Sequence, residues 1–379
     1  MTLQVGIIFG GPSVEHEISI LSAMQVLHTM ENGPYKPIPI YISKQLDWYC
    51  DDALFDLDNY KDLKQLCAKM KPVQLIRQRQ ELMIVRKKKG LLKEYINIDV
   101  VLPVIHGNMG EDGCLQGLLS MYGVPFAGSE TAAAAIGPDK WLMKQILEAN
   151  GIAVLKWRGI TVFQDTKQWQ SCFDAIGYPC IIKPAKLGSS IGIQVASSYE
   201  EACQSLQKAF QYDTHVVVEP YLKQVKEYNI SILGDEEKQE ASVVEEVMKN
   251  DEILSYHDKY EKGSKSKGMA GLNRIVPAEL TDALREQMET MAKNAFVALR
   301  LSGVCRIDFL YDGKQLYINE VNTIPGSLAY YLWEESKVPF RHLIMRLIQI
   351  AIRRTRRKDA MITTYDTNIL AGNHGGVKK

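Results

Sequence analysis

Apolar residues in the first third of the chain gather in short runs, separated by a glycine loop and an amphipathic segment. The run from 5 to 9 ends in Gly10-Gly11, and residues 13–30 then carry apolar side chains at helical spacing. Two more apolar runs, at 38–42 and 100–105, have the length of buried strands. A strand, a glycine loop and a helix followed by further buried strands indicate an open parallel α/β sheet.

The pattern changes after residue 150 to short runs rich in β-branched residues. These runs predict strands at 160–163, 179–184, 191–195 and 216–219, with one helix at 199–210. A second series predicts strands at 228–233, 241–248, 274–277, 304–311 and 316–321, and helical periodicity predicts helices at 131–149, 282–301 and 340–352. Many strands with few helices between them favour two compact α+β units after the parallel sheet.

Two stretches lack this patterning. Residues 51–94 are polar and end near the basic run Arg86–Lys89, which we interpret as a solvated hairpin or loop. The chain from Arg353 onward is basic and then rich in Gly, Asn and Thr, so we predict a disordered tail over 356–379. The predicted organisation is an N-terminal α/β domain over 1–136, followed by units at 137–222 and 223–355.

The composition favours an ordered protein that acts on small molecules. The chain has 379 residues, 46% hydrophobic and 24% charged, as is typical of globular proteins with two or three domains. Lys and Arg number 45, as do Asp and Glu, so no net field attracts nucleic acid or an anionic membrane. Scattered cysteines, and the absence of a signal-like or membrane-length apolar segment, predict a cytoplasmic protein with reduced thiols.

The segment with the most candidate functional side chains is a predicted hairpin around Asp312-Gly313, a dipeptide that strongly favours a tight turn between strands. Because side chains alternate along a strand, each strand has a polar and an apolar face. The polar face carries Arg306, Asp308, Glu320 and Asn322, and the apolar face carries Ile307, Phe309, Tyr317 and Val321.

Burying these polar groups is costly unless they are paired or coordinated. Oxygen ligands without His or thiolate select hard cations, and Mg²⁺ takes one or two carboxylates together with phosphate oxygens. We therefore predict Asp308, Glu320 and Asn322 as metal ligands, with Arg306 left for phosphate. A self-satisfied network of these side chains is the alternative.

Two further segments suit a nucleotide. Lys183 ends an apolar strand and needs an anion nearby, and the following Gly188–Gly192 loop could wrap phosphate oxygens, although its spacing is not that of a P-loop. Residues 216–222 run from an apolar strand into an extended linker that could offer backbone groups to an adenine edge. A plain turn and a structural hinge are the respective alternatives.

Together these segments resemble the ATP-grasp fold, in which nucleotide and Mg²⁺ lie between two α+β subdomains. The segment 10–19, His106-Gly107, and the motifs at 110–113 and 115–117 are similar to signatures of the D-alanine:D-alanine ligase family. The likeness spans residues 6–332. It implies an N-terminal parallel α/β domain followed by a two-subdomain ATP-grasp fold, with a mobile lid at 258–273.

The resemblance also implies roles for individual residues. The ATP-binding residues would be Lys140, Lys183, Ser190, Glu219, Tyr221, Leu222, Glu227 and Lys259, and two Mg²⁺ (or Mn²⁺) ions would be bound by Asp308, Glu320 and Asn322. The catalytic residues would be Glu15, Ser189, Tyr260 and Arg306, and the substrate-binding residues His106, Gly326, Tyr331 and Leu332. A structural histidine at 106 and an ordinary surface loop at 258–273 are the alternatives.

The implied reaction is ATP-dependent joining of two D-alanines through D-alanyl phosphate, for peptidoglycan precursors, by a homodimer formed through the N-terminal domain. One position departs from the family pattern, because Tyr331-Leu332 stand where a Ser-Leu pair usually holds the second substrate's carboxylate. A ligase for another D-amino acid, a 2-hydroxy acid or another dipeptide is therefore an alternative. A non-catalytic nucleotide-binding protein is a further one.

Overall fold

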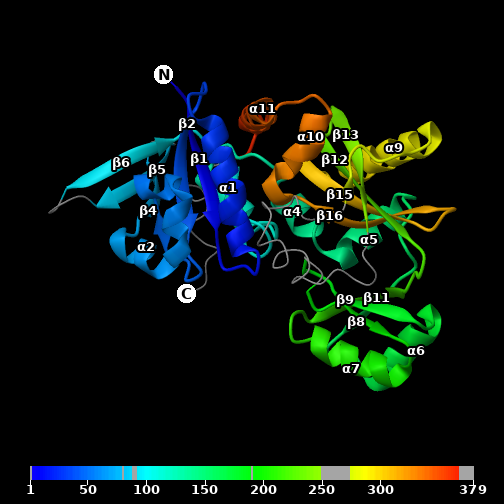
Figure 1. Ribbon diagram of the computed structural model, residues 1–379. Helices are drawn as coiled ribbons and strands as arrows, with labels where there is room; N and C mark the ends of the chain where they lie inside the picture. The colour runs from blue at the N-terminus through cyan, green and yellow to red at the C-terminus, as the bar shows by residue number, and fades with distance from the viewer. Residues whose placement is uncertain (1, 79–80, 88–91, 189–190, 249–273, 367–379) are drawn as a thin grey trace.

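The computed structural model describes residues 2–366 apart from 79–80, 88–91, 189–190 and 249–273. Three sheet-containing bodies follow one another along the chain (Figure 1). A long helix near the C-terminus, α11, packs between the first and third bodies in an apolar cluster shared with α1 and β15. The two ends of the described chain thus stabilise the same region.

The first body contains a sheet with the strand order β3-β2-β1-β7. Its strands are β1 (Gln4–Gly10), β2 (Lys36–Ile42), β3 (Trp48–Tyr49) and β7 (Val100–Pro103), with helices α1 (His16–Met30) and α3 (Cys114–Tyr122). β1 pairs in parallel with β2 and β7, which confirms the predicted parallel sheet, and β3 adds an antiparallel edge. A Cβ on Gly10 would lie 2.3 Å from the oxygen of Ile42, so the β1–α1 turn requires glycine there.

The polar stretch between β3 and β7 forms elements that its sequence pattern does not predict. They are η1 (Asp52–Phe55), η2 (Leu57–Asp62), α2 (Leu63–Lys69) and a sheet of β4 (Gln74–Gln78), β5 (Glu81–Lys87) and β6 (Lys93–Ile98). Leu82 and Ile84 alternate into a core shared with Ile8. Arg86 lies in the β5–β6 hairpin but is not fully solvated, because it is partly buried and donates to Cys50 Sγ at 3.6 Å.

The second body is an antiparallel sheet with the order β10-β9-β11-β8. Its elements are β8 (Arg158–Thr161), α6 (Thr166–Ile176), β9 (Cys180–Pro184), β10 (Gln194–Ala196), α7 (Tyr199–Ala209) and β11 (His215–Pro220). Both helices cover the same face of the sheet (Figure 1). The pattern predicts only α7, although a capping box of Asp165 and Gln168 marks the start of α6.

The single helix predicted over 131–149 is two helices, α4 (Thr131–Ile136) and α5 (Lys140–Ala149). Pro138 between them cannot donate a helical hydrogen bond and disfavours helical geometry at the residue before it. The carboxylate of Asp139 then caps α5 by accepting the N–H groups of Trp141 and Leu142. This break places Lys140 at the first turn of α5, where its amide donates to Ala185 at 2.9 Å.

The third body is a sheet with the order β14-β13-β12-β15-β16, covered by helix α9. Its elements are β12 (Lys226–Gly234), β13 (Gln239–Val247), β14 (Arg274–Ile275), α9 (Asp282–Ala298), β15 (Gly303–Tyr311), β16 (Leu316–Asn322), η4 (Gly326–Ala329) and α10 (Tyr330–Glu335). The predicted strands and helices of this region are therefore present with shifted ends.

Helix α11 (Phe340–Asp359) is longer than predicted, and the prediction of a disordered tail from 356 is wrong for its first residues. Arg354 is largely buried, stacks on Phe126 and donates to the backbone oxygens of Phe126, at 2.6 Å, and Gly128. Lys358 pairs with Glu130 at 2.5 Å. The basic residues that resemble a tail in the sequence thus attach α11 to the first body.

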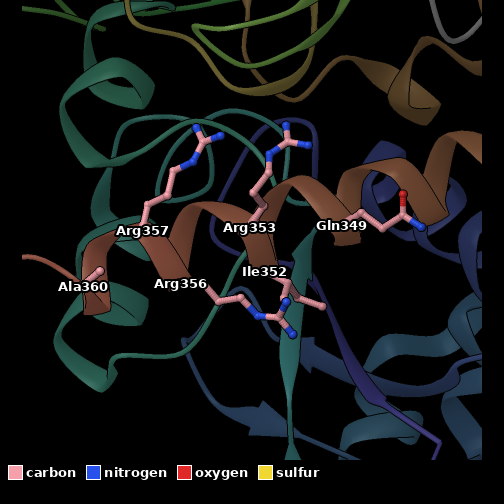
Figure 2. A pocket seen from close by; sticks show the side chains of 6 residues that line it. All are labelled: Gln349, Ile352, Arg353, Arg356, Arg357 and Ala360. Carbon is pink, nitrogen blue, oxygen red and sulfur yellow. The ribbon is translucent and has the colours of Figure 1, made fainter.

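The exposed side of α11 borders a groove of 660 Å³ lined by Gln349, Ile352, Arg353, Arg356, Arg357 and Ala360. Figure 2 shows Arg353 and Arg357 extending from one side of the helix and Arg356 from the other. Arg353 pairs with Asp235, and Arg357 with Glu237 at 2.6 Å. Like every helix in the described residues, α11 is too short or too polar to cross a membrane.

We expect Arg354→Ala to lower the free energy of unfolding by about 2 kcal/mol, because two carbonyl groups lose a charged donor. Arg356→Ala, on the exposed side of the same helix, should change it by less than about 0.5 kcal/mol. Urea denaturation of both variants measures the difference. Equal midpoints would show that the Arg354 contacts do not hold α11 in place.

Candidate active site

Side chains from all three bodies meet around the polar face of the β15–β16 hairpin. From the first body, His106 Nδ1 lies 2.8 Å from the backbone oxygen of Ile324, just after β16. From the second, Lys183 Nζ donates to Asn319 Oδ1 at 3.0 Å. Residues far apart in the sequence are therefore brought into one site.

The hairpin has the predicted register over its polar residues. Arg306 lies opposite Asn322, and Asp308 lies opposite Glu320. Four polar side chains thus share one face, while Ile307 on the other face is fully buried in the core.

A β-bulge changes the rest of the prediction. Phe309 pairs with Ile318, so Asn319 is an additional residue on β16. Ile318 is consequently buried in the core, whereas Tyr317 is only partly buried, with its hydroxyl 3.3 Å from Gln315. The predicted place of Tyr317 on the apolar face is wrong, because a two-residue period cannot reveal an inserted residue.

Arg306 and Asp308 form a bidentate ion pair. Nε and Nη2 of Arg306 each lie 2.7 Å from an oxygen of Asp308, and Asn322 Nδ2 donates to Asp308 Oδ2 at 3.2 Å. Burial raises the pKa of Asp308 to about 6, against the opposing effect of Arg306. The alternative of a self-satisfied network thus describes part of the hairpin.

The polar face also fits a hard cation. Asp308, Glu320 and Asn322 provide only oxygen donors, as Mg²⁺ prefers. Within the described ranges, no three His, Cys, Asp or Glu side chains gather closely enough to bind a metal by themselves. A cation here would therefore need Asn322 and ligand oxygens besides the two carboxylates.

Glu219 is the most deeply buried carboxylate of the site. Its oxygens lie 2.5 Å from Lys144 Nζ and 2.6 Å from Lys183 Nζ, and its side chain is completely buried. Burial alone would raise its pKa, but the two ammonium groups lower it to about 2. Burial lowers the pKa of Lys144, because it disfavours the charged ammonium group. Glu219 in β11 thus holds α5 and β9 in place through ion pairs with Lys144 and Lys183.

Two residues of this region are missing from the sequence predictions. Lys144 lies one helical turn after Lys140 on α5, a spacing that could have indicated a shared face. Asn319 reaches Lys183 only because of the bulge, and no sequence signal marks it. Lys140 itself donates to Leu187 O at 2.6 Å and lies 3.9 Å from Glu320 Oε2, which brings α5 to the polar face.

Four predicted ATP-binding residues, which by the resemblance line the adenine and ribose site, lie in β11 or shortly after it: Glu219, Tyr221, Leu222 and Glu227. Tyr221 and Leu222 lie in the linker to β12, where the Tyr221 amide donates to Pro179 O at 3.0 Å. Glu227 lies in β12. All three side chains are partly exposed, unlike Glu219.

His106 links the first body to the turn after β16. Its Nδ1 faces a carbonyl acceptor, the Ile324 oxygen, so Nδ1 carries the proton and Nε2 accepts from Ser22 Oγ at 2.8 Å. Ser22 Oγ in turn accepts the N–H of Ser327 at 2.9 Å. Burial lowers the pKa of His106, which keeps the ring neutral. These contacts suit the structural alternative for His106, and its substrate-binding role stays a prediction.

Glu15 lies between two glycine loops at the start of α1. Its Oε2 is 3.3 Å from where a Cβ on Gly107 would lie, and 3.9 Å from that position on Gly188. The buried Glu111 accepts the N–H groups of Gly107 and Ile324 at 2.8 and 2.9 Å. Burial, followed by the charge of Glu15, raises the pKa of Glu111 to about 8.

The turn after β16 has an uncommon backbone. Ser327, Leu328 and Ala329 have φ angles of 50°, 54° and 50°, a left-handed turn that L-residues rarely adopt. Gly326 precedes it, and a Cβ there would meet no atom within 4 Å. The Gly326 backbone therefore borders open space.

Tyr331 and Leu332 lie in the first turn of α10, which begins at Tyr330 directly after this turn. The Tyr331 hydroxyl donates to Glu245 Oε2 at 2.6 Å, and the Leu332 side chain is completely buried in the fold. Leu332 could contact a ligand only through its backbone. The predicted residues Ser189, Ser190, Lys259 and Tyr260, and the predicted lid at 258–273, lie outside the described residues.

Both halves of the chain match models of one protein family, and a known member of that family resembles nearly all of it. Residues 4–129 match the family model described as D-ala D-ala ligase N-terminus, and residues 146–349 match D-ala D-ala ligase C-terminus. A D-alanine:D-alanine ligase from Thermosipho melanesiensis is 36% identical over 97% of this chain and 98% of its own.

Solved structures agree over similar lengths. The D-alanine-D-alanine ligase from Coxiella burnetii has a TM-score of 0.80 and 26% identity, covering 94% of this chain and 96% of that one. The VanG D-Ala:D-Ser ligase from Enterococcus faecalis has a TM-score of 0.77 and 27% identity, covering 93% of this chain and 100% of that one. The similarity therefore includes every described body of the fold.

We expect Glu219→Gln to destabilise the protein by about 3 kcal/mol near neutral pH, because two buried lysines lose their counter-charge. The folded-state pKa of Glu219, about 2, lies below its ordinary value of 4.5. Its contribution is therefore complete above the ordinary value and is lost as the pH falls toward 2. The difference between wild type and variant should narrow as the pH falls below about 5.

Urea denaturation in steps from about pH 7 to about pH 3 measures this difference. Glu237→Gln is the control, since Glu237 pairs with Arg357 at an exposed position and should matter by less than about 0.5 kcal/mol throughout. A difference for Glu219→Gln that stays constant with pH would contradict the assigned ionisation.

Proposed function

Because the chain belongs to the D-alanine:D-alanine ligase family, we propose that it joins two D-alanines at the expense of ATP, for the synthesis of peptidoglycan precursors. Family membership confirms the predicted fold class, an N-terminal α/β domain followed by an ATP-grasp fold. It also confirms that the protein is an ATP-dependent ligase acting on small molecules.

One observation carries the assignment of chemistry to residues. The hairpin that carries the proposed oxygen ligands lies against lysines from two other elements. Lys140 is 3.9 Å from the proposed ligand Glu320, and Lys183 is 3.0 Å from Asn319, the residue before it. Oxygen ligands beside ammonium groups suit a metal-bound polyphosphate, which carries both cation and negative charge.

The first step would activate a carboxylate. An oxygen of the first D-alanine attacks the γ-phosphorus, the bond to the leaving ADP breaks, and an acyl phosphate forms. Two Mg²⁺ held by Asp308, Glu320 and Asn322 would neutralise the developing phosphate charge. Lys140, Lys183 and Arg306 would bind the phosphate oxygens, and Glu15 would orient the ammonium group of the first substrate.

The second step would form the peptide bond. The neutral amine of the second substrate attacks the acyl carbon and forms the C–N bond. The tetrahedral intermediate then collapses as the C–O bond to phosphate breaks, and the nitrogen loses one proton, which the leaving phosphate can take up. Arg306 and the N–H of Gly326 would stabilise the oxyanion of that intermediate. Ser189 and Tyr260, which would complete a hydrogen-bonded set with Glu15, lie outside the described residues.

The identity of the second substrate has a specific alternative. VanG, a D-Ala:D-Ser ligase, is similar over 93% of this chain, and Tyr331 replaces the serine that the family pattern places there. D-Serine or a 2-hydroxy acid as acceptor would retain the same first step. We also infer a homodimer formed through the N-terminal domain, and a cytoplasmic location where ATP is available.

We expect ADP release with ATP, Mg²⁺ and D-alanine as the sole amino acid, together with the dipeptide as product. Chromatography of products with D-alanine, L-alanine, D-serine and D-lactate, singly and in pairs, identifies both substrates. If ATP binds but no combination yields ADP, the non-catalytic alternative is correct.

Glu320→Gln should lower kcat by about 100-fold or more, because an amide is a weaker ligand for a hard cation. Glu237→Gln, at the exposed pair with Arg357, is the control and should retain wild-type turnover. Titration of ADP release with Mg²⁺ measures both. Unchanged turnover and Mg²⁺ dependence in Glu320→Gln would refute the proposed metal site.

A further inference from the structure

Four residues of the third body form a polar cluster beside the hairpin. The Tyr331 cluster consists of Tyr331 in α10, Glu245 in β13, Arg274 in β14 and Asn229 in β12. Glu245 Oε2 accepts from Tyr331 at 2.6 Å and from Asn229 at 3.0 Å, and Glu245 Oε1 lies 3.5 Å from Arg274 Nη1. Glu245 is thus the acceptor that holds the other three side chains.

The cluster continues the polar face of the hairpin across the sheet. Directly paired residues on four neighbouring strands are, in order, Glu245, Asn229, Asp308 and Glu320. Because paired strands lie about 5 Å apart, the backbones of Glu245 and Asp308, two strands apart, are separated by roughly 10 Å. The Tyr331 cluster therefore lies beside the proposed metal site, on the same face of the sheet.

Tyr331 has no hydroxyl hydrogen to spare for a ligand. A phenol carries one hydrogen, and Tyr331 donates it to Glu245 in a short bond. The hydroxyl therefore cannot at the same time donate to a substrate carboxylate, as the serine of the family pattern would. Another donor has to perform that role.

Arg274 is the cation placed to do so. Its guanidinium carbon lies 4.3 Å from the centre of the Tyr331 ring, and its side chain is 22% exposed. In the described part of the chain Glu245 is the one carboxylate within 4 Å of it, and a single contact at 3.5 Å leaves most of its five N–H donors uncommitted there. A guanidinium fixed by stacking and one ion pair suits bidentate binding of a carboxylate.

We propose that Arg274 binds the carboxylate of the second substrate, and that Tyr331 and Glu245 are positioning residues for its guanidinium. The inference rests on the proposed ligase function. A charged donor on strand β14 would then do the work of the serine hydroxyl that the family pattern places at the position of Tyr331 in α10. The acceptor class is accordingly a small α-amino or 2-hydroxy acid with a free carboxylate.

Two assays distinguish binding of the second substrate from formation of the acyl phosphate. Hydroxylamine attacks an acyl phosphate to give a hydroxamate and phosphate, so hydroxamate formation from ATP and D-alanine reports the first step without the second substrate. Dipeptide formation reports both steps. Absence of hydroxamate with the wild-type protein would overturn the proposed function, and with it this inference.

In Arg274→Met we expect the KM for the second D-alanine to rise about 10- to 100-fold, as for loss of a charge-assisted hydrogen bond. Hydroxamate formation should stay within about twofold of wild type, since the first step does not use Arg274. Arg274→Lys, which keeps the charge but loses the planar fork, should be intermediate. Arg285→Met, at an exposed arginine on α9, is the control and should match wild type.

D-Alaninamide, which lacks the carboxylate, tests recognition directly. The wild-type protein should prefer D-alanine to D-alaninamide as acceptor, and Arg274→Met should lose most of that preference. Tyr331→Phe keeps the ring and removes the bond to Glu245, so it should weaken the preference by a smaller factor. An unchanged preference in Arg274→Met, or an equal loss of hydroxamate and dipeptide formation, would overturn the assignment.

Discussion

The ion pairs of Glu219 with Lys144 and Lys183 are the constraint on which the site depends. A carboxylate with no exposed surface is tolerable only when its charge is compensated within hydrogen-bond distance, and both lysines provide that at 2.5 and 2.6 Å. The pairs fix α5 against β9 and β11, and the bond from Lys183 to Asn319 extends the same constraint to β16. These charges act together with apolar contacts of α5, whose Met143 and Leu147 pack in the core of the third body and whose Trp141 ring contacts His215 at the start of β11.

Compensation of a buried charge also stabilises the polar face of the hairpin. Asp308 is buried, and its oxygens are held by Arg306 and Asn322. A self-satisfied network and a metal site are thus not exclusive, because the groups that compensate the carboxylate are themselves suited to phosphate or metal. Extended through Asn229 to Glu245, this face forms a polar row across four strands, whereas the opposite face packs on α9.

The turn after β16 shows what the first body contributes. Three consecutive left-handed residues cost roughly 1–2 kcal/mol each, so neighbouring contacts must hold them. Ser22 from α1 accepts the Ser327 N–H, His106 bonds to Ile324, and Glu111 accepts the Ile324 N–H. The strained turn then sets the direction of the Gly326 backbone and of Tyr331 at the start of α10. His106, Glu111 and Ser22 of the first body thus hold this turn in its conformation.

The sequence by itself determined the parallel first sheet, the strands of the hairpin and the shared face of Arg306, Asp308, Glu320 and Asn322. These features depend on local periodicity and turn residues, which a single strand or helix already contains. Only the tertiary structure decided that Asn319 bulges toward Lys183, that Lys144 shares Glu219 with Lys183, and that α11 continues to Asp359. It also decided that Tyr331 bonds to Glu245 beside Arg274. Each of these depends on a partner distant in the sequence, and a buried charge selects its partner by proximity in the folded chain, which residue order alone does not specify.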